Sequence, residues 1–328
     1  CASWLPNVLF HYFGRLEPTF IKTILSTNAC RPNKNNSRNF RYGRKIQMSL
    51  ATLSDVLTPA LRNGYAVGGL VTLGWEDMSA YVKAAQTVGV PVILQAGPSC
   101  RQHTPLPILG KMFRYLADSV DVPVVAHLDH GYTYEECKIA LECGFTSLMY
   151  DGSRKPLQQN IDETAAIVEM AHSANISCEG EIGFVGYQNG DHSKGTDPDE
   201  AKLFASGTGV DAMAISCGNV HLQEHKRGSL DLNRIKEIEA LTNLPLVIHG
   251  GSGIPVEQRR NLSRTTNICK FNIGTELRMV FGNALRKAIY SDKIRFDRLQ
   301  IMQETIDPVY VATIEVLKGF GGPTDLLS

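Results

Sequence analysis

The chain has 328 residues, of which 43% are hydrophobic and 20% charged, and its formal net charge is zero. This composition is typical of a globular protein with a full core, and a neutral chain gives no general reason to expect binding to nucleic acid or to a membrane. No apolar run reaches the roughly 18–20 residues that a membrane span needs. The eight scattered cysteines form no C-x-x-C pair, so we expect free thiols in a reducing compartment and a cytoplasmic protein.

The first 47 residues differ from the rest of the chain. They contain eight Lys or Arg and a single acid, Glu17, and the stretch 31–44 is polar, basic and aperiodic, so we expect it to be disordered. Three interpretations compete: an artefact foreign to the native chain, a transit peptide that would allow organellar import, and a basic binding arm. We interpret Met48 as a native start, so that residues 48–328 form the predicted domain.

From residue 50 onward, short β-branched runs alternate with longer amphipathic stretches. The expected strands are 66–73, 91–96, 122–128, 145–150, 176–182, 210–215, 244–248 and 268–273. The expected helices between them are 76–88, 106–119, 133–142, 157–174, 198–206, 231–242, 255–264 and 275–290. Their apolar residues recur at spacings of three and four, which is the period of one helix face.

Eight strand–helix units in about 240 residues predict an α/β fold, the (β/α)₈ TIM barrel, because parallel strands need helical crossovers and eight of them close into a barrel. The alternative is a doubly wound open sheet, which usually has a Gly-rich turn after its first strand. Here Gly68 and Gly69 lie within the first strand, so that signature is absent. We expect an extra N-terminal helix at 52–62 to cap the barrel bottom. One or two C-terminal helices at 297–318 would cover the barrel or form an oligomer interface.

Polar residues gather where the predicted strands end. In such a barrel the functional groups lie at the carboxyl ends of the strands, which open onto one mouth. The residues there are His127, Asp129 and His130 after the third strand, Asp151 and Ser153 after the fourth, Glu179 and Glu181 on the fifth, Asn219 and His221 after the sixth, His249 after the seventh and Asn272 on the eighth. A single histidine at a strand end is usually structural, but the joint pattern predicts an active site.

Three histidines of this set fit a metal site. Neutral imidazoles around an open position suit a catalytic Zn²⁺, and His130, His221 and His249 come from three different strand ends. Asp129 directly precedes His130. Adjacent side chains of an extended segment point apart, so we expect one of this pair to bind metal while the other faces the substrate as a base.

Two glutamates lie on one face of the fifth strand, because Glu179 and Glu181 are two residues apart. One of them could orient a metal-binding histidine through a hydrogen bond. The alternative is a structural hydrogen-bond network inside the barrel.

Two glycine-containing turns lead directly into helices. They are the segments 250–253, which include Gly250 and Ser252, and 272–275, which include Asn272, Gly274 and Thr275. Exposed backbone N–H groups and the helix macrodipole favour an anion at such positions. Because the loops after strands seven and eight are the usual phosphate site of these barrels, the sequence predicts that they bind phosphate.

These motifs resemble a known family. The segments His127–Gly131, Met149–Ser153, Asn160–Ile161, Glu179–Gly183, Ala214–His221, His249–Gly253 and Lys270–Glu276 make residues 50–318 similar to class II, zinc-dependent ketose-bisphosphate aldolases, which include fructose- and tagatose-bisphosphate aldolases. The resemblance implies that His130, His221 and His249 bind Zn²⁺, with Asp129 carrying the proton and Glu181 as the acid beside the metal. Gly250, Ser252, Asn272, Gly274 and Thr275 would hold the substrate phosphate.

The reaction implied by this resemblance is reversible retro-aldol cleavage of a phosphorylated ketose, as in glycolysis and other carbohydrate metabolism. The products would be a fragment like dihydroxyacetone phosphate and an aldehyde. A monovalent cation is a second cofactor that the resemblance allows, and a homodimer or homotetramer is the implied assembly. Lys270 on the last strand raises the alternative of a Schiff-base aldolase.

The sequence departs from the family in three places. The first strand runs on through 70–75 without the usual Phe-Asn pair, Leu222 replaces the glycine that commonly follows the histidine, and the loop 184–192 lacks the usual glutamate, for which Asp191 or His192 could substitute. These changes surround the substrate, so a ketose 1-phosphate or an unusual bisphosphate is as well supported as fructose 1,6-bisphosphate. The alternatives to an aldolase are a metal-dependent sugar-phosphate epimerase or isomerase, and a non-catalytic aldolase-like binding protein.

Overall fold

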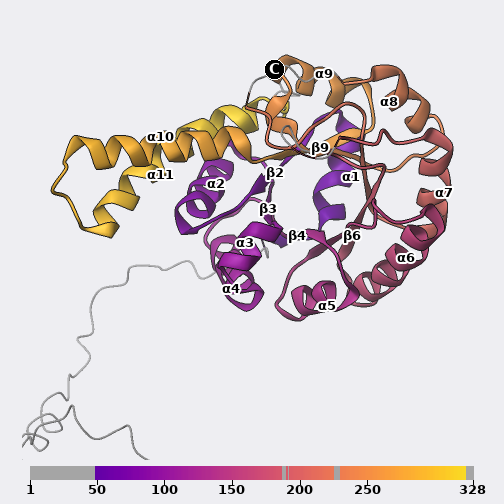
Figure 1. The fold of residues 1–328 in the computed structure, drawn as a ribbon, viewed down its shortest axis with the longest axis horizontal. Coiled ribbons are helices and arrows are strands. Elements are labelled where there is room, and N and C mark those ends of the chain that lie inside the picture. The colour runs from indigo at the N-terminus through magenta and orange to yellow at the C-terminus, as the bar shows by residue number, and fades with distance from the viewer. Residues whose placement is uncertain (1–48, 187–189, 191, 225–229, 323–328) are drawn as a thin grey trace, which may run out of the picture. The chain divides into compact units, whose positions relative to one another are not determined.

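A computed structural model describes residues 49–186, 190, 192–224 and 230–322 of the chain. The predicted basic extension 1–47 lies outside these residues. The described part forms a closed barrel of parallel strands surrounded by helices (Figure 1). The predicted (β/α)₈ barrel is therefore confirmed.

Eight strands, β2 to β9, close the barrel. Each pairs in parallel with the next along the chain, and β9 pairs with β2. Their bounds are β2 (Val67–Val71), β3 (Val92–Ala96), β4 (Val124–Gly131), β5 (Ser147–Tyr150), β6 (Ser177–Ile182), β7 (Ala212–Ile215), β8 (Leu246–Ile248) and β9 (Ile268–Ile273). Each corresponds to a strand expected from the sequence. Most are shorter than expected, but β4 continues to Gly131, three residues past its predicted end.

The helices alternate with the strands on the outside of the barrel. They are α2 (Trp75–Val88), α3 (Pro98–His103), α4 (Leu106–Asp118), α5 (Tyr134–Glu142), α6 (Leu157–Ser173), α7 (Pro198–Thr208), α8 (Leu232–Glu239), α9 (Val256–Thr265) and α10 (Thr275–Ser291). The short α3 was not expected, since its six residues show too little periodicity to be recognised. A proline at its first position still favours a helix start there.

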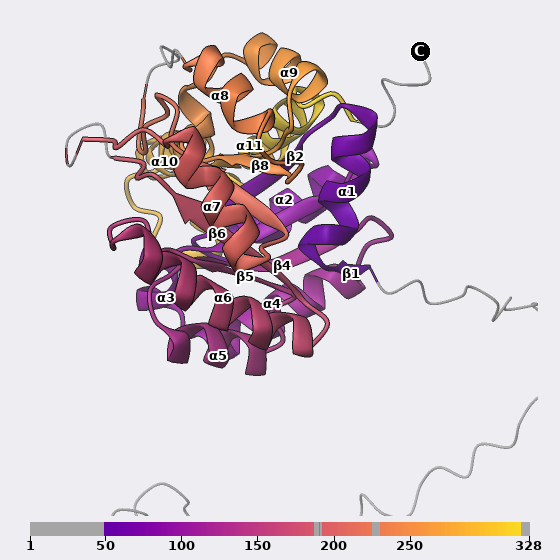
Figure 2. The same ribbon diagram turned by 90° about the vertical axis from the view of Figure 1, so that its right-hand side faces the viewer.

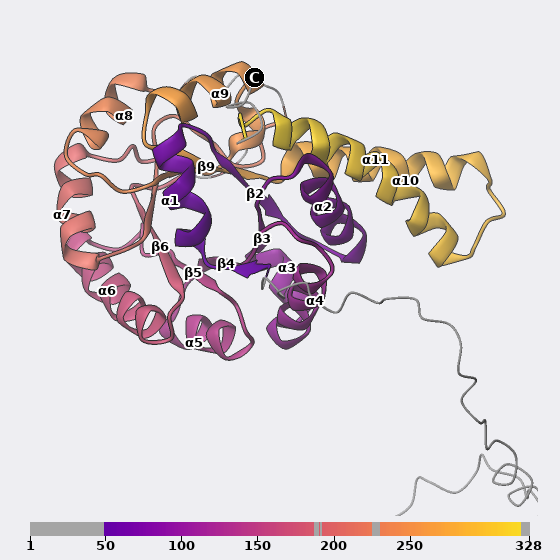
Figure 3. The ribbon, with the colours of Figure 1, turned by 180° about the vertical axis from the view of Figure 1, so that it is seen from behind.

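The bottom of the barrel is capped by the first helix, α1 (Leu53–Asn63). It begins at Thr52, whose hydroxyl and backbone N–H exchange hydrogen bonds with Asp55, and ends at Gly64 in the left-handed conformation. Its buried face packs on the inward side chains of the strands, including Val67, Ile93 and Val247. In Figure 3 this helix lies across the end of the barrel, which confirms the predicted cap.

A two-residue strand, β1 (Leu50–Ala51), precedes this cap and was not expected from the sequence. It pairs in parallel with the start of β4, where Leu50 lies opposite Val124. Because its pairing is so short, no alternation of residues could reveal it. β1 and α1 together occupy the end of the barrel away from the carboxyl ends of the strands (Figure 2).

The C-terminal helix is a single one, α11 (Arg298–Lys318), and it packs beside α2 and α10. Together α10 and α11 form a helical arm that projects from the barrel (Figure 1). Its tip exposes large apolar side chains, of which Ile294, Phe296 and Leu299 are 88%, 93% and 78% exposed. Within the described residues, no helix combines the length and the apolar character that a membrane span requires.

Candidate active site

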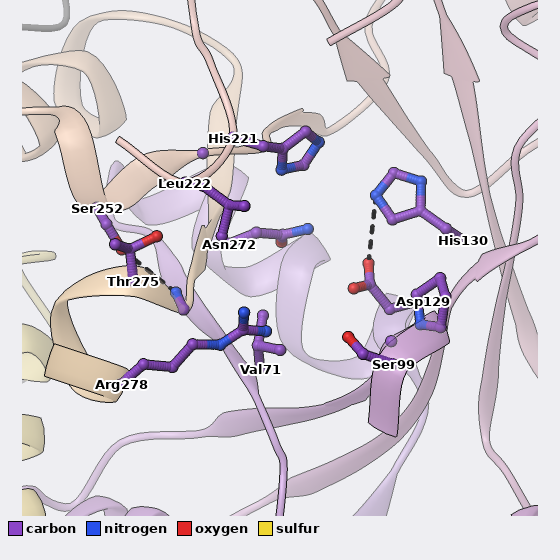
Figure 4. A pocket seen from close by; sticks show the side chains of 14 residues that line it. Val71, Ser99, Asp129, His130, His221, Leu222, Ser252, Asn272, Thr275 and Arg278 are labelled. Carbon is purple, nitrogen blue, oxygen red and sulfur yellow. Dashed lines mark hydrogen bonds and ion pairs between the residues drawn. The ribbon is translucent and has the colours of Figure 1, made fainter. Parts of the chain in front are cut away.

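A pocket opens at the carboxyl ends of the barrel strands, as the sequence predicts (Figure 4). Its walls are formed by Val71, Gly97, Pro98, Ser99, Asp129, His130, His221, Leu222, Gly250, Ser252, Asn272, Gly274, Thr275 and Arg278. Nine of the ten predicted site residues are either among these or directly beside them, since His249 lies against His130. The tenth, Glu181, is buried behind the wall.

The three predicted metal ligands lie together. One ring nitrogen each of His130, His221 and His249 falls within 4.8 Å of the others, and His130 Nε2 lies 3.0 Å from His249 Nδ1. Their rings meet edge to face, with the His221 centroid 5.5 Å from that of His130 and 5.6 Å from that of His249. Three converging nitrogens with one side open to the pocket suit a tetrahedral metal that keeps a position for substrate.

Two of these histidines are held neutral. Burial, together with the charge of His130, lowers the pKa of His221 to about 4, and the same causes hold the pKa of His249 well below its ordinary value. A neutral imidazole presents a lone pair, which is the form that binds a metal ion. The donor set therefore fits Zn²⁺.

His130 has the opposite electrostatic environment. Burial by itself would lower the pKa of His130, but the carboxylates of Asp129, Asp151 and Glu181 raise it to about 10. These acids favour positive charge at this point of the site. A bound metal ion would supply that charge, and His130 would then act as a neutral ligand.

The backbone at His130 corrects one expectation from the sequence. Asp129 and His130 were expected to point apart as neighbours in an extended segment, yet both side chains line the pocket, with Asp129 Oδ1 4.0 Å from His130 Nε2. His130 has a φ of +53°, and the pairing of β4 with β5 shifts register between Leu128 and Gly131. This bulge rotates the histidine to the same side as the aspartate.

Carboxylates orient two of the histidines. His130 Nδ1 lies 2.8 Å from Asp151 Oδ2, and His249 Nε2 lies 3.2 Å from Glu179 Oε1. Such contacts fix the tautomer of a metal-binding imidazole and leave its other nitrogen for the metal. Of the two glutamates considered from the sequence, Glu179 makes the hydrogen bond to a predicted ligand.

Glu181 lies beside the histidine cluster. Its Oε2 is 3.6 Å from His130 Nδ1 and has no hydrogen-bond partner among the described residues. Burial and the neighbouring charge of Asp151 raise the pKa of Glu181 to about 8. Glu181, Asp151 and His130 together form a second group that could hold a cation. An unpartnered buried carboxylate oxygen beside such a group fits the predicted acid near the metal.

A buried ion pair lies beneath the histidines, inside the barrel. Lys270 Nζ is 2.6 Å from Glu179 Oε2 and 3.5 Å from His127 Nε2, and His127 Nδ1 lies 2.8 Å from Ser147 Oγ. None of the side chains of Lys270, Glu179 and His127 is exposed. Glu179 thus joins the histidine cluster to a buried network, and its contacts agree with both of the alternatives considered for this residue.

The residues predicted to bind phosphate line the wall of the pocket that lies across from Asp129 and His130 (Figure 4). Gly250 has a φ of +65°, and a Cβ there would lie 2.2 Å from the Val220 carbonyl oxygen, so only glycine fits. Ser252 Oγ accepts hydrogen bonds of 3.3 Å from the backbone N–H groups of Gly274 and Glu276, at the N-terminus of α10. This helix start is an arrangement that attracts an anion.

Several pocket residues were missed by the sequence analysis. Val71 ends β2, Ser99 is the second residue of α3, and Arg278 stands three residues after Thr275 in α10. Arg278 could have been found, since residues three apart on a helix share one face and Thr275 was already placed in the site. Ser99 could not, because α3 itself was not expected.

Two of the three positions at which the sequence departs from the family pattern can be located relative to the pocket. Leu222 lines the pocket with a φ of +56° and is 49% exposed. No described residue of the loop 184–192 lines the pocket, and His192 is exposed to solvent. Asp191, the other residue considered as a substitute for the missing glutamate, lies outside the described residues.

The chain belongs to the class II fructose-bisphosphate aldolase family, whose profile matches residues 51–322. It is a class II aldolase, a carbon–carbon lyase. A fructose-bisphosphate aldolase from Geobacillus stearothermophilus is 35% identical over 282 residues, covering 84% of this chain and 98% of that protein. A 6-phospho-5-dehydro-2-deoxy-D-gluconate aldolase from Shouchella clausii is 34% identical, covering 84% and 95%.

Solved structures agree with the fold. The YdjI aldolase from Escherichia coli K12 has a TM-score of 0.72 and 28% identity, with 83% of this chain and 98% of that chain covered. A protein from Coccidioides immitis, described as a putative fructose-1,6-biphosphate aldolase, also has a TM-score of 0.72, at 22% identity and with 84% and 99% covered. The expected family and fold are therefore confirmed.

Proposed function

We propose that this protein is a Zn²⁺-dependent aldolase that reversibly cleaves a phosphorylated ketose into a fragment like dihydroxyacetone phosphate and an aldehyde. The observation that carries the proposal is the pocket itself, in which three converging histidine nitrogens and Asp129 face a backbone anion site. The names of the relatives offer fructose bisphosphate and a deoxy-gluconate phosphate as candidate substrates.

In this mechanism His130, His221 and His249 hold the metal, which as a Lewis acid supplies charge stabilisation at the ketose oxygens when bound. Asp129 takes the proton from the hydroxyl next to the bond that breaks. Its Oδ1 accepts a 3.1 Å hydrogen bond from Gln95 Nε2, which orients the carboxylate, while Oδ2 faces the pocket near Gly97. Acid–base help of this kind is typically worth about 10²–10⁴-fold in rate.

The anion site would hold the phosphate of the ketose. Gly250, Ser252 and Gly274 line the same wall as the N-terminus of α10, whose positive dipole end favours an anion. These groups fix the substrate so that its reacting carbons lie between the histidines and Asp129, and such positioning supplies a large part of a catalytic rate enhancement.

A Schiff-base mechanism through Lys270 has less support. Its Nζ is fully buried and paired with Glu179, and Lys270 does not line the pocket. A lysine nucleophile must reach the substrate carbonyl as a free amine. Borohydride treatment in the presence of substrate should therefore trap no adduct, whereas a trapped adduct on Lys270 would contradict the metal mechanism.

A cleavage assay with a panel of ketose phosphates, with and without chelator, tests the proposal. We expect chelator-sensitive release of triose phosphate; epimerised product without cleavage would favour an epimerase, and protein with neither bound zinc nor activity would favour a binding protein. His130→Ala, His221→Ala and His249→Ala should each lose metal, while Asp129→Ala should keep metal and lose turnover. Equal metal loss in Asp129→Ala would contradict the division of roles.

We also propose that the protein is a homo-oligomer, a homodimer or homotetramer, that contacts its copies through the arm of α10 and α11. Three large apolar side chains at its tip, Ile294, Phe296 and Leu299, are almost fully exposed, and such clusters usually mark interaction sites. Sedimentation of the wild type and of Ile294→Ser/Phe296→Ser checks this. A monomeric wild type would refute it.

The cytoplasm remains the proposed location. Six cysteines in the described residues are free thiols, five of them buried. Free thiols persist in a reducing compartment, which supports this assignment.

A further inference from the structure

A buried arginine outside the pocket lining contacts the backbone of two central site residues. Arg101 lies in α3, which packs beside the end of β4, and its side chain is only 7% exposed. Its Nη1 donates hydrogen bonds of 2.7 Å to the carbonyl oxygens of Ala96 and Asp129. Its Nη2 donates a hydrogen bond of 3.0 Å to the carbonyl oxygen of His130. The guanidinium therefore joins the end of β3 to the residues that carry the catalytic carboxylate and a metal ligand.

The same guanidinium is held from its other side by Glu136, in the first turn of α5. Glu136 Oε1 lies 2.9 Å from Arg101 Nε and 2.8 Å from Arg101 Nη2, and Glu136 Oε2 accepts a hydrogen bond of 3.0 Å from the backbone N–H of Tyr132. An arginine has five N–H donors in a rigid fork, and the three carbonyl contacts and two carboxylate contacts together match all five. Because no donor is left for a substrate, Arg101 acts through the groups that it holds.

The carbonyl groups of Asp129 and His130 decide where the His130 side chain points. Peptide groups are planar, so the direction of the Asp129 carbonyl fixes the rotation φ of His130, and the direction of the His130 carbonyl fixes its rotation ψ. His130 has a φ of +53°, in the left-handed region that residues with a Cβ rarely adopt. Such a conformation persists only where the surrounding structure holds it. Arg101 holds both of the peptide groups that flank the His130 Cα.

The strand pairing is irregular at this point, so the backbone needs support from outside the sheet. The register between β4 and β5 shifts between Leu128 and Gly131, and Asp129 and His130 fall within this shift. A bulge disrupts the hydrogen bonds between strands, and buried carbonyl groups then need other donors. The charged guanidinium supplies them with hydrogen bonds that are stronger than those between neutral groups. In a regular extended strand Asp129 and His130 would face opposite sides of the sheet, and only one of them could reach the pocket.

We propose, resting on the aldolase function above, that Arg101 is a positioning residue that locks the left-handed backbone of His130. The lock keeps a metal ligand and the carboxylate that takes the proton on the same side of the sheet, with His130 Nε2 4.0 Å from Asp129 Oδ1. Glu136 acts through Arg101, because it holds the guanidinium in place. The ligand geometry is then built before a metal ion binds, and binding requires no rearrangement of the strand end.

The zinc affinity of the metal-free full chain tests the lock without any substrate. Arg101→Met keeps much of the length of the side chain and removes all five donors. Competition with a chromophoric chelator should show zinc binding that is about 10–100-fold weaker, which is the loss typical of removing a group that orients a metal ligand. Arg101→Lys keeps the charge but has three donors on one nitrogen, so its zinc affinity should lie between those of the wild type and Arg101→Met. Wild-type zinc affinity in either variant would overturn the proposal.

Cobalt in place of zinc reports the ligand geometry, because the visible absorption of Co²⁺ depends on the number and arrangement of its ligands. We expect Arg101→Met to weaken and shift this absorption as His130 leaves the ligand set. Arg234→Met is the matched control, since Arg234 Nη1 also donates to a backbone carbonyl, that of Thr196, at 2.9 Å, and Arg234 pairs with Asp231 at the start of α8. None of these three residues lines the pocket, so the control should keep the wild-type zinc affinity and cobalt spectrum. Equal changes in both variants would overturn the proposal.

Glu136→Ala tests the lock from the other end and covers the case in which Arg101→Met does not fold. Without this partner Arg101 should hold the two carbonyl groups less firmly, and zinc binding should weaken several-fold. The losses should not add in Arg101→Met/Glu136→Ala, because residues that act through one network are coupled. Additive losses would show that Glu136 acts independently and would overturn its assignment.

Kinetics at saturating zinc separate positioning from substrate binding. A misplaced Asp129 should lower kcat in Arg101→Met by up to about 10²-fold. The KM for a phosphorylated ketose should change little, since the wall proposed to hold the phosphate is untouched. A raised KM with an unchanged kcat would place Arg101 in substrate binding and overturn the proposal. Because the zinc affinity and the cobalt spectrum need no substrate, they decide the role of Arg101 even for a wild type that cleaves no ketose phosphate, a result that would refute the aldolase function alone.

Discussion

Replacing Lys270 with methionine should expose how strongly the barrel interior depends on one ion pair. Lys270 Nζ lies 2.6 Å from Glu179 Oε2, and neither side chain has any exposed area. Removing one partner of a buried pair leaves an uncompensated charge and typically costs about 3–5 kcal/mol. We expect Lys270→Met to lower the free energy of unfolding by that amount. Methionine approximates the length of lysine, so a cavity contributes little to the loss.

The double variant Lys270→Met/Glu179→Gln provides the control. Glutamine keeps an oxygen that can accept from His249 Nε2, which lies 3.2 Å from Glu179 Oε1, but it carries no charge. Urea unfolding of the metal-free proteins should show the double variant recovering most of the stability lost in Lys270→Met. Its zinc affinity, measured by competition with a fluorescent chelator, should still be about 10–100-fold weaker, because the carboxylate behind a metal-binding histidine is gone. A double variant no more stable than Lys270→Met would refute the reasoning.

Two further predictions concern stability. Burial raises the pKa of Asp77 to about 6, although backbone N–H groups including that of Gly74 lower it. Since this exceeds the ordinary aspartate pKa of 3.8, the protonated carboxyl stabilises the fold below about pH 4, and about 3 kcal/mol of this stabilisation is lost as the pH rises through 6. Urea unfolding of wild type and Asp77→Asn at pH 4 and pH 7 measures this; a constant difference would contradict it. Gly110→Ala should destabilise strongly, because its Cβ would lie 2.1 Å from the Cys143 carbonyl oxygen. Gly282→Ala in α10 should stabilise by roughly 0.5–1 kcal/mol, because its Cβ would meet only the Arg286 guanidinium, at an ordinary van der Waals distance of 3.7 Å. Equal unfolding temperatures for the two alanine variants would contradict this prediction, since the structure would then relieve the clash at Gly110.

Much of the fold could be predicted because the barrel strands are short apolar runs bounded by glycine or proline. The positions of His130, His221 and His249 followed from the same reasoning, since His249 directly follows such a run, His130 and His221 follow theirs after two and six residues, and parallel strands bring their carboxyl ends to one mouth. Local sequence was sufficient here because each strand is recognisable from its own apolar run. Closure of the barrel then brings the carboxyl ends of all the strands to one mouth.

The rest depended on contacts that no local pattern encodes. The left-handed backbone of His130 arises from a register shift between β4 and β5, so the alternation of side chains failed where it was used to separate Asp129 from His130. Ser99 lines the pocket at the start of α3, a helix of six residues that is too short to show a periodic pattern. Leu222 was recognised as a departure, but its position in the pocket and its strain required the structure.

The helix α10 connects the pocket to the tip of the arm. It begins at Thr275 in the anion wall and ends at Ser291 near the apolar tip of the arm, and its 17 residues span about 26 Å. A copy of the protein that binds the arm would therefore contact the C-terminal end of α10. The N-terminal end of the same helix positions the predicted phosphate site and Arg278. A substitution at the tip, far from any reacting atom, should then alter KM for the phosphorylated substrate. Measured affinities would depend on protein concentration whenever association is incomplete.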